Sequence, residues 1–536
     1  MTNAKILKVD ESDNVLVALF DLAPGEVRYN DLTINLSAPI PQKHKFLTMD
    51  LKAGEKVIMY GVPVGTINTD LSAGTQITIE NVTHFADPIS LENWSSYAWE
   101  PLDVSQWKDK TFQGYHREDG KVGTANYWLF VPLVFCENRN LKIIEEALTK
   151  GLGYHKPNKH EEYVRHKISS ESTFKTSGKQ ERVFENVDGI KFLYHHGGCG
   201  GTRQDSEALL RLLAGYVNHP NVAGATVLSL GCQHAQISWF QEIQDELYPQ
   251  VKKPVIYLEQ QKILSEEKLI TEAIDQTMEA LIKANKIERK PASLSKLVVG
   301  LECGGSDGFS GISANPAVGY ASDLIASLGG ATILSEFPEL NGVEQNIIDR
   351  CVSTEVAEKF VRIQRAYEAK AKSVGSGFDM NPSPGNIKDG LITDAIKSAG
   401  AAKKGGKSFV VDILDYTEPL TKAGLNLLCT PGNDVESTTG LAGSGANIIL
   451  FTTGLGTPTG NPITPVIKIS SNTSLFERMN GIIDIDAGAI TRGERTIEEV
   501  GENLLEKIIA VASGEETKAM QLEQNDFIPW KRGVSL

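Results

Sequence analysis

Four cysteines each follow an apolar run that is typical of a buried strand. They are Cys136, Cys199, Cys232 and Cys303, and glycine is adjacent to three of them. Open α/β sheets bind ligands at the carboxyl ends of parallel strands, so these cysteines are candidates to converge. Because thiolates ligate metals, the pattern suggests a metal or iron–sulfur site. For each cysteine alone, the alternative is a packed hydrophobic side chain. The spacing is not CxxC, which argues against a zinc ribbon.

Three histidines lie beside two of these cysteines. His195 and His196 lead directly into Gly197-Gly198-Cys199, and His234 comes two residues after Cys232. A neutral imidazole can ligate Fe(II), Mn(II) or Zn(II), and it can also act as a general base. The alternative for each histidine is a hydrogen-bonded loop residue.

A polar loop rich in glycine, ECGGSDGFSGISANPAVG at 302–319, directly follows the strand-like run KLVVGL. Its backbone N–H groups and hydroxyls suit a carboxylate or a polyhydroxylated chain. Similar turns at 381–386, 430–434 and 451–462 favour one shared crevice, although each could be simple turn chemistry. The loop matches neither GxGxxG nor a Walker A motif. GFSG is one residue short of the GxSxG nucleophile elbow, so a Ser–His–Asp hydrolase is weakly supported.

The elements that would position these loops change in type along the chain. Residues 1–92 contain short β-rich runs (KILKV, NVLVALF, KVIMYG and TQITIENV) separated by turn signals, which predicts a small all-β module. Residues 93–115 are expected to be a packed connector. Apolar runs then alternate with amphipathic segments in 116–290 and again in 291–536. This alternation predicts two α/β domains with mainly parallel sheets.

Composition narrows the class of protein. The chain has 536 residues, enough for several domains, and its net charge of −15 argues against nucleic acid or an anionic membrane as the main partner. We see neither a signal peptide nor an apolar run long enough to span a membrane. Six cysteines in so long a chain do not indicate a disulfide framework. We therefore expect a cytoplasmic protein with a small-molecule partner.

Several of these motifs resemble one known family over nearly the whole chain, the altronate/galactarate dehydratases. The matching runs are FQGYHREDGKVGTANYW, HHGGCGGTRQD, VLSLGCQHAQ, ECGGSDGFSGISANPAVGYASD, NPSPGNIKDGL, TPGNDVESTTG, FTTGLGTPTGNP and IDIDAGAI. PGND at 431–434 and the terminal IPWKRGVSL are similar to the altronate branch. The resemblance implies a β-clip (SAF-like) module, two α/β domains, a possible homodimer, and loss of water across C2–C3 of a hexonate.

The resemblance also implies a metal, and for such a reaction we assign roles to the residues singled out above and to further polar residues. The cofactor would be Fe(II) or Mn(II), with an iron–sulfur cluster as the alternative. The expected metal ligands are drawn from Cys136, Cys199, Cys232, Cys303 and Glu302. The expected base is His195, His196 or His234. The residues expected to bind the substrate carboxylate and hydroxyls are Arg203, Ser306, Asp307, Asn315, Asn386, Lys388, Asn433 and Asp434. Two rival hypotheses are a galactarate dehydratase and a non-catalytic sugar-acid sensor.

The β module departs from the family pattern at one place. The resemblance implies a histidine-rich HxHxHN stretch, but residues 76–81 read QITIEN, in which Glu80 is the remaining candidate oxygen ligand. His44, in PQKHKF, does fit the pattern. The role of the module is therefore open.

Overall fold

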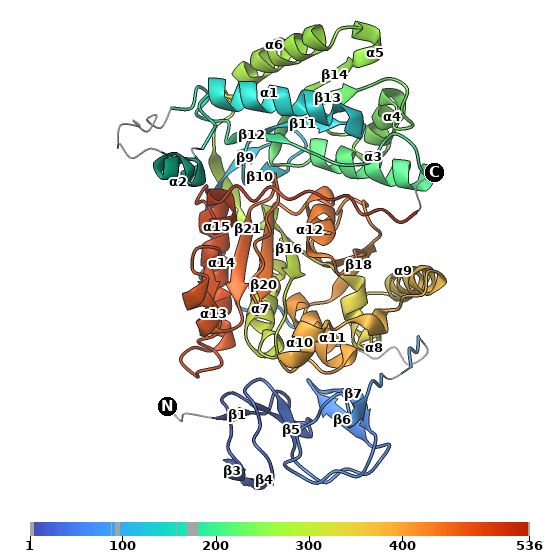
Figure 1. Ribbon diagram of the computed structural model, residues 1–536, viewed down its shortest axis with the longest axis vertical. Coiled ribbons are helices and arrows are strands. Elements are labelled where there is room, and N and C mark those ends of the chain that lie inside the picture. The colour runs from blue at the N-terminus through green and yellow to red at the C-terminus, as the bar shows by residue number, and fades with distance from the viewer. Residues whose placement is uncertain (1–4, 87, 92–96, 157, 169–180, 534–536) are drawn as a thin grey trace. The chain divides into compact units, whose positions relative to one another are not determined.

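The chain divides into two units that draw on separate stretches of sequence (Figure 1). The computed structural model describes residues 5–86, 88–91, 97–156, 158–168 and 181–533, so residues 93–96 of the predicted connector lie outside it. Unit 1 comprises Met1–Gln113 and Pro291–Trp530, and unit 2 comprises Gly114–Lys290 and Lys531–Leu536. The β module and the C-terminal α/β part thus belong to the same unit.

The β module of unit 1 is built from short antiparallel strands. One sheet has the order β1-β2-β5, another the order β6-β7-β8, and β3 and β4 form a hairpin. The bounds are β1 Ile6–Leu7, β2 Val15–Ala18, β3 Gly25–Tyr29, β4 Leu32–Leu36, β5 Lys45–Leu47, β6 Lys56–Met59, β7 Val62–Ile67 and β8 Val82–Thr83. Alternate side chains such as Ile34 and Leu36 point into a core around Leu16 and Phe46.

One predicted strand of the module is wrong. TQITIENV at 75–82 forms only an isolated bridge at Gln76 and then a turn before β8. The Asn81 side chain holds that turn, because it accepts from the Thr78 N–H and donates to the Gln76 carbonyl. An asparagine that bonds to nearby backbone competes with strand pairing, which overrode the β-branched pattern here.

The α/β part of unit 1 is a seven-stranded parallel sheet of order β18-β19-β17-β16-β20-β21-β22. Its strands are β16 Val298–Cys303, β17 Ala331–Leu334, β18 Val410–Leu414, β19 Gly424–Leu428, β20 Ile448–Thr453, β21 Val466–Ser470 and β22 Ile485–Asp486. The central strands β16 and β20 are buried along almost their whole length, as expected where helices cover both faces. Their carboxyl ends gather the loops that carry most of the polar motifs.

The helices of unit 1 flank this sheet. α7 packs against α14, while α12 contacts β16, and Figure 1 draws α14 and α12 on opposite sides of the sheet. The bounds are α7 Ala314–Ser327, α8 Glu344–Asp349, α9 Thr354–Ser373, α10 Pro384–Lys388, α11 Asp394–Ala402, α12 Asp434–Gly443, α13 Thr473–Arg478, α14 Ile497–Ala512 and α15 Lys518–Gln521.

Unit 2 contains a four-stranded parallel sheet of order β12-β11-β13-β14. Its strands are β11 Tyr127–Pro132, β12 Gly189–Phe192, β13 Val222–Ser229 and β14 Val255–Glu259. Its helices are α1 Asn138–Gly151, α2 Lys159–Ile168, α3 Arg203–Val217, α4 Ile237–Leu247, α5 Gln260–Ile263 and α6 Glu266–Ala284. The buried core around Trp128 and Phe130 joins the sheet to α1 and α6. Three short strands lie at the unit boundaries: β9 Thr111–His116, β10 Val122–Gly123 and β15 Lys290–Ser293.

The predicted fold class is confirmed: an all-β module precedes α/β parts with parallel sheets. Among the described residues, none of the helices has both the length and the apolar character needed to cross a bilayer.

Candidate active site

The residues singled out in the sequence fall into two sets, one in each unit. Unit 1 holds Glu302, Cys303, Ser306, Asp307, Asn315, Asn386, Lys388, Asn433 and Asp434. Unit 2 holds Cys136, His195, His196, Cys199, Arg203, Cys232 and His234. Cys303 therefore belongs to a different unit from the other three cysteines, and each set is described in its own unit.

A buried cluster of acids and a thiol lies where β16 and β17 end. The Sγ atom of Cys303 is 3.3 Å from Glu336 Oε2 and 3.1 Å from Glu339 Oε2. Glu336 also accepts the backbone N–H of Cys303, at 3.0 Å, and it has a φ of 68°, which is uncommon for a residue other than glycine. Burial, reinforced by the two carboxylates, raises the pKa of Cys303 well above its usual value, so the group is a neutral thiol.

Two buried lysines balance the charge of this cluster. Lys404 Nζ lies 2.8 Å from Glu336 Oε2, and Lys397 Nζ lies 2.5 Å from Glu339 Oε1. Burial opposes ionisation of Glu339, but Lys397 and Lys404 outweigh it and lower the pKa of this carboxyl to about 2. Burial likewise disfavours the ammonium of Lys404, yet the surrounding acids raise its pKa. The cluster is therefore held together by ion pairs that are almost fully desolvated.

Glu302 sits beside this cluster as a carboxyl held by hydroxyls. Its Oε2 atom accepts from Ser335 and Ser437, each at 2.6 Å, while its Oε1 atom is buried without a hydrogen-bond partner. Burial, together with the charge of Glu336, raises the pKa of Glu302 well above the usual range. The structure thus presents the side chain expected to ligate a metal as a protonated acid.

Asp434 is the more accessible acid of the same region. It is the first residue of α12, and burial, together with the charges of Glu336 and Glu339, raises its pKa to about 7. The loop after β16 approaches it closely, because a Cβ atom at Gly304 would lie 2.1 Å from Asp434 Oδ2. A carboxyl that titrates near neutrality can exchange a proton with a substrate, so its position is suited to acid–base chemistry.

The β module contributes a second polar group to unit 1 through Lys43, His44 and Lys45. Lys43 Nζ lies 3.0 Å from the buried Oδ2 of Asp307 and 2.9 Å from Asp389 Oδ1. Lys45 is fully buried and donates to the Gly390 carbonyl at 2.6 Å. Burial lowers the pKa of Lys45 to about 7, although Asp307 opposes that change.

His44, which fits the family pattern, has both ring nitrogens engaged. Its Nδ1 atom lies 2.9 Å from Gln76 Nε2, and its Nε2 atom lies 3.2 Å from the Lys388 carbonyl. Burial, together with the positive charge of Lys45, lowers its pKa, so the ring is neutral. His44 thus links the turn at Gln76 to α10.

The residues expected to bind substrate in unit 1 differ in accessibility. Asn315 is buried between the Gly400 carbonyl and the Thr452 hydroxyl, and Asn386 donates to the Ser306 carbonyl while capping α10. Asp307 accepts from Phe309 N–H, Ser310, Ser471 and Asn472 in addition to Lys43. These three residues support the loops. Ser306 is buried, and the exposed residues of this set are Lys388 and Asn433.

The histidines of unit 2 also separate into two kinds. His195 is buried, with Nε2 2.7 Å from the Pro132 carbonyl and Nδ1 accepting the Gly197 N–H at 3.1 Å. Burial lowers its pKa to about 4, although the bond to Pro132 opposes that change. His196 and His234 are exposed, as is Arg203 in the first turn of α3. His195 is thus occupied in holding its loop.

The three cysteines of unit 2, Cys136, Cys199 and Cys232, are all exposed and none forms a disulfide. Burial raises the pKa of Cys136, and the charges of Cys199 and Cys232 add to this effect. Cys199 and Cys232 therefore both lie within electrostatic range of Cys136.

Sequence reasoning missed the lysines and two of the acids of unit 1. Lys43 and Lys45 flank the histidine that was noticed, and a lysine within the apolar run KFL was a usable signal. Glu336 and Glu339 in SEFPEL, and Lys397, lack a neighbouring glycine or cysteine, and Lys404 lies in the polar run KKGGK, so nothing in their spacing marked them.

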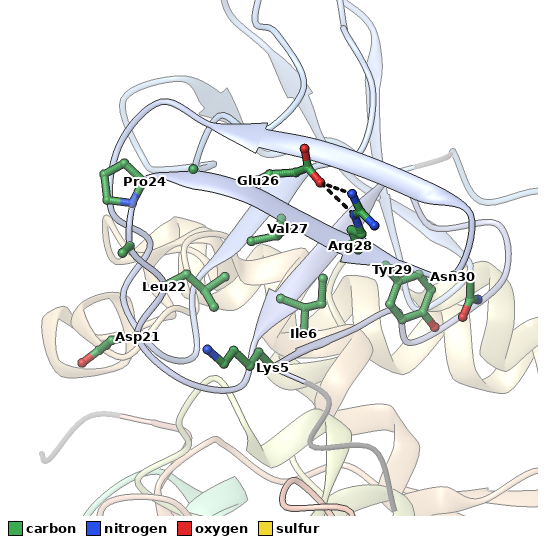
Figure 2. Close-up of a pocket in the computed structure, with 12 residues that line it drawn as sticks. Lys5, Ile6, Asp21, Leu22, Pro24, Glu26, Val27, Arg28, Tyr29 and Asn30 are labelled. Carbon is green, nitrogen blue, oxygen red and sulfur yellow. Dashed lines mark hydrogen bonds and ion pairs between the residues drawn. The ribbon is translucent and has the colours of Figure 1, made fainter.

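A separate pocket of about 690 Å³ lies in the β module (Figure 2). It is lined by Lys5, Ile6 and residues 21–30, and its one ion pair joins the exposed side chains of Glu26 and Arg28. Its lining residues include no cysteine, no histidine and no buried acid, so we do not assign a catalytic role to this pocket.

Comparisons with known proteins indicate one family along nearly the whole chain. Three family models match: the altronate/galactarate dehydratase SAF domain at 4–84, the D-galactarate dehydratase/altronate hydrolase second domain at 114–285, and the D-galactarate/altronate dehydratase C-terminal domain at 294–535. Altronate dehydratase of Escherichia coli is 33% identical over 99% of both chains, and that of Bacillus subtilis is 34% identical over 99% of both. Galactarate dehydratase (L-threo-forming) of E. coli is 32% identical over 95% of this chain and 92% of its own.

Proposed function

Because this chain belongs to the altronate/galactarate dehydratase family, we propose that it is a hydro-lyase that converts D-altronate into 2-dehydro-3-deoxy-D-gluconate. Two altronate dehydratases match it from end to end, and PGND at 431–434 is similar to that branch. The observation that carries the chemical proposal is Asp434, a partly accessible carboxyl with a pKa of about 7 at the carboxyl edge of the large sheet.

The reaction requires a base for the proton at C2 of the sugar acid. That proton is weakly acidic because it lies next to a carboxylate, and the C3 hydroxyl must leave as the C2–C3 double bond forms. We assign the base to ionised Asp434, which would receive the C2 proton on a carboxylate oxygen. The C3 hydroxyl leaves as water after it gains a proton, which balances the proton that Asp434 took from C2 and returns the carboxylate to its ionised form. The resulting enol then loses its O–H proton and gains one at C3 to give the 2-oxo product.

The surroundings of Asp434 support this role. Burial, together with the charges of Glu336 and Glu339, keeps the pKa of Asp434 near neutrality rather than near 4, and Lys404 and Lys397 hold those two acids in place. Gly304 leaves room directly beside the Asp434 carboxylate. Lys388 and Asn433 are exposed and are our candidates for binding the substrate carboxylate and hydroxyls.

The family also implies iron or manganese, and two groups of residues can be tested for fit. In unit 1, donor atoms of Cys303, Glu336 and Glu339 lie within 4.8 Å of one another. The two ammonium groups already paired with these carboxylates would repel a dication, and the thiol is neutral, so this group does not fit a resident metal. The three exposed thiols of unit 2 do fit iron, for which thiolates are good ligands. Iron bound there would supply a Lewis acid.

We further propose that the enzyme works in the cytoplasm. None of the six cysteines, all of which lie in the described part of the chain, forms a disulfide, which suits a reducing compartment.

The test is anaerobic turnover of D-altronate by iron-loaded or manganese-loaded enzyme, with galactarate in a parallel assay and detection of the 2-oxo product. Product from altronate supports the proposal. Product from galactarate alone would overturn the substrate assignment. If the enzyme has metal bound and forms product from neither compound, the proposed function is overturned. Asp434→Asn should abolish turnover, whereas Glu436→Gln, a neutralisation in the same helical turn, should retain it.

A further inference from the structure

A small pocket of unit 1 is lined by residues of the β module and by residues in and beside the helices α8 and α11. Its volume is about 100 Å³, and its lining includes valine and alanine side chains together with Tyr60, Tyr97, Asn346, Arg350, Lys403 and Lys407. Three of these residues are cations, and no carboxylate is among the described residues that line the pocket. It shares no residue with the group around Asp434, so it is a separate site.

A tight turn after α11 brings two lysines to this pocket. The run KKGGK at 403–407 forms the turn, and Gly406 within it has a φ of 60°. A Cβ atom at Gly406 would clash with the carbonyl oxygen of Gly319 in α7, so the turn can pack against that helix only because the residue is glycine. This packing places Lys403 and Lys407 together on the wall of the pocket.

Arg350 supplies the third positive charge, and only 4% of this residue is exposed. Its Nη2 atom donates to the carbonyls of Gly405 and Ser408, at 2.9 and 2.8 Å, and its Nε atom donates to Ser408 at 3.2 Å. The Nη1 atom has no hydrogen bond to a described residue. The charge of Asp323 acts on Arg350, but the two side chains do not form an ion pair. Because a buried cation is costly unless it is paired, Arg350 is suited to receive an anion.

The three cations repel one another in this pocket. Partial burial lowers the pKa of Lys403, and the positive charges of Lys407 and Arg350 act in the same direction. Asp10 and Asp13 oppose this change, but neither of them lines the pocket. Both of these carboxylates already accept hydrogen bonds from backbone N–H groups. An anion in the pocket would therefore relieve a repulsion that the nearby acids offset only in part.

Two tyrosines fix the shape of the pocket. Tyr60 lies in the turn between β6 and β7, and its hydroxyl reaches so close to Gly311 that a Cβ atom there would clash with it. Tyr97 donates its hydroxyl to the Lys407 carbonyl at 2.7 Å. The Lys403 ammonium lies 5.9 Å from the centre of the Tyr60 ring. Contacts within the protein thus hold the walls in place before any ligand binds.

The size of the pocket limits its occupant. One water molecule takes up about 30 Å³ of liquid, whereas pockets for drug-sized ligands measure roughly 300–1,000 Å³. A pocket of about 100 Å³ therefore admits one small anion and is too small for a hexonate. The planar donors of an arginine match the oxygens of phosphate and carboxylate groups.

We infer that this pocket binds one small oxyanion, a phosphate group or a short carboxylate, through Arg350, Lys403 and Lys407. Asn346 is exposed beside them and can add an amide donor. Because the β module and the elements around α8 and α11 line the same pocket, the bound anion joins parts of unit 1 that are far apart in the sequence. The inference goes beyond the proposed function, since its ligand is not the substrate.

The experiment is isothermal titration calorimetry of the full chain in a buffer free of phosphate and carboxylates. Sodium phosphate and sodium acetate are the two probes, titrated separately. We expect saturable binding of about one anion per chain, which weakens as sodium chloride is added because the contacts are ionic. The probe that binds more tightly identifies the oxyanion as phosphate or carboxylate. Lack of saturation by either probe up to about 20 mM would overturn the inference.

Variants locate the bound anion. Lys403→Gln and Lys407→Gln should each weaken binding at least about fivefold, and the double variant at least about twentyfold. Lys370→Gln, which neutralises an exposed lysine of α9 outside the pocket, is the matched control and should bind within about twofold of the wild type. Equal weakening in the control would indicate a general effect of charge, and unchanged binding in the double variant would place the anion elsewhere. Either result would overturn the inference.

Folding and catalysis are separated from binding in this design. Lys403 and Lys407 are exposed, so their substitution should leave the fold intact, which circular dichroism and thermal melting check. Arg350 is not replaced, because its loss would leave two backbone carbonyls without their donor. The titrations contain no altronate. A chain that binds the anion but does not dehydrate altronate would therefore overturn the proposed function and leave this inference in place.

Discussion

Replacing Lys45 by methionine should stabilise unit 1 at neutral pH. The side chain is fully buried, and burial lowers its pKa from 10.5 to about 7. At about 1.36 kcal/mol per pKa unit, that difference corresponds to a cost of roughly 5 kcal/mol for holding the ammonium in the folded state. Methionine has a similar length and no charge. It would leave the Gly390 carbonyl without its donor, which costs about 1–3 kcal/mol, so the net gain is about 2–4 kcal/mol.

The gain should depend on pH in a defined direction. Below about pH 7 Lys45 is protonated in both the folded and the unfolded state, so the wild type bears the full cost. Between about pH 7 and 10.5 the unfolded chain binds more protons than the folded chain, and the wild type becomes more stable as the pH rises. The advantage of Lys45→Met should therefore be largest at pH 6 and smaller at pH 9.

Urea titration with maleimide labelling of the buried Cys351, read by peptide mass spectrometry, reports unfolding of unit 1 separately from unit 2. Lys43→Met is the control, because Lys43 is paired with Asp307 and Asp389 and its loss should destabilise unit 1. A Lys45→Met variant that is less stable than the wild type by the same amount at pH 6 and pH 9 would refute the reasoning. Such a result would mean that the ammonium is well solvated or paired in the folded state.

Four further predictions concern the candidate sites. Lys404→Met leaves Glu336 buried without its cation and should cost about 3–5 kcal/mol in urea unfolding; an unchanged midpoint would show that this pair is not desolvated. If ionised Asp434 is the base, kcat/KM should rise with pH through about 7, and Asp434→Asn should lose that limb of the profile. Gly304→Ala should displace the Asp434 carboxylate and lower kcat on the order of 100-fold, and it should also lower the melting temperature because the added Cβ would lie 2.6 Å from the buried Phe451 ring. His195→Gln should keep most of its turnover because the ring is engaged with backbone; a loss above about 100-fold in a stable variant would restore it as a candidate base.

Much of the fold followed from hydrophobic pattern. The apolar runs at 127–132 and 448–453 are β11 and β20, and the amphipathic stretch at 354–373 is α9. Short helices such as α10 and α11 were missed because five to nine residues carry too little periodicity to separate them from loops. α7 begins at Ala314, inside the polar loop sequence 302–319, whose glycines and small polar residues hide its first turn.

The candidate site was predicted only where the type of a residue indicated its chemistry. Cysteines after strands marked the edge of the unit 2 sheet, and the glycine-rich loop marked the edge of the large sheet. The acids that contact Cys303 come from elsewhere in the chain. An ion pair such as Lys397 with Glu339 can be recognised only once the fold has brought the two residues together. The grouping of residues 1–113 with 291–530 likewise depends on tertiary packing, which local patterns do not encode.

The division of unit 1 into two chain segments has a consequence for its synthesis. Lys45 and the carbonyl that receives its hydrogen bond are 345 residues apart. At about 5–20 residues per second, a ribosome needs about 17–70 s to make the second partner after the first. During that interval Lys45 lies in an apolar strand of the nascent β module without the carbonyl to which it later donates. The segment that forms most of unit 2 is synthesised between the two segments of unit 1. The order of translation therefore delays completion of unit 1 until its second segment, residues 291–530, has followed most of unit 2 out of the ribosome.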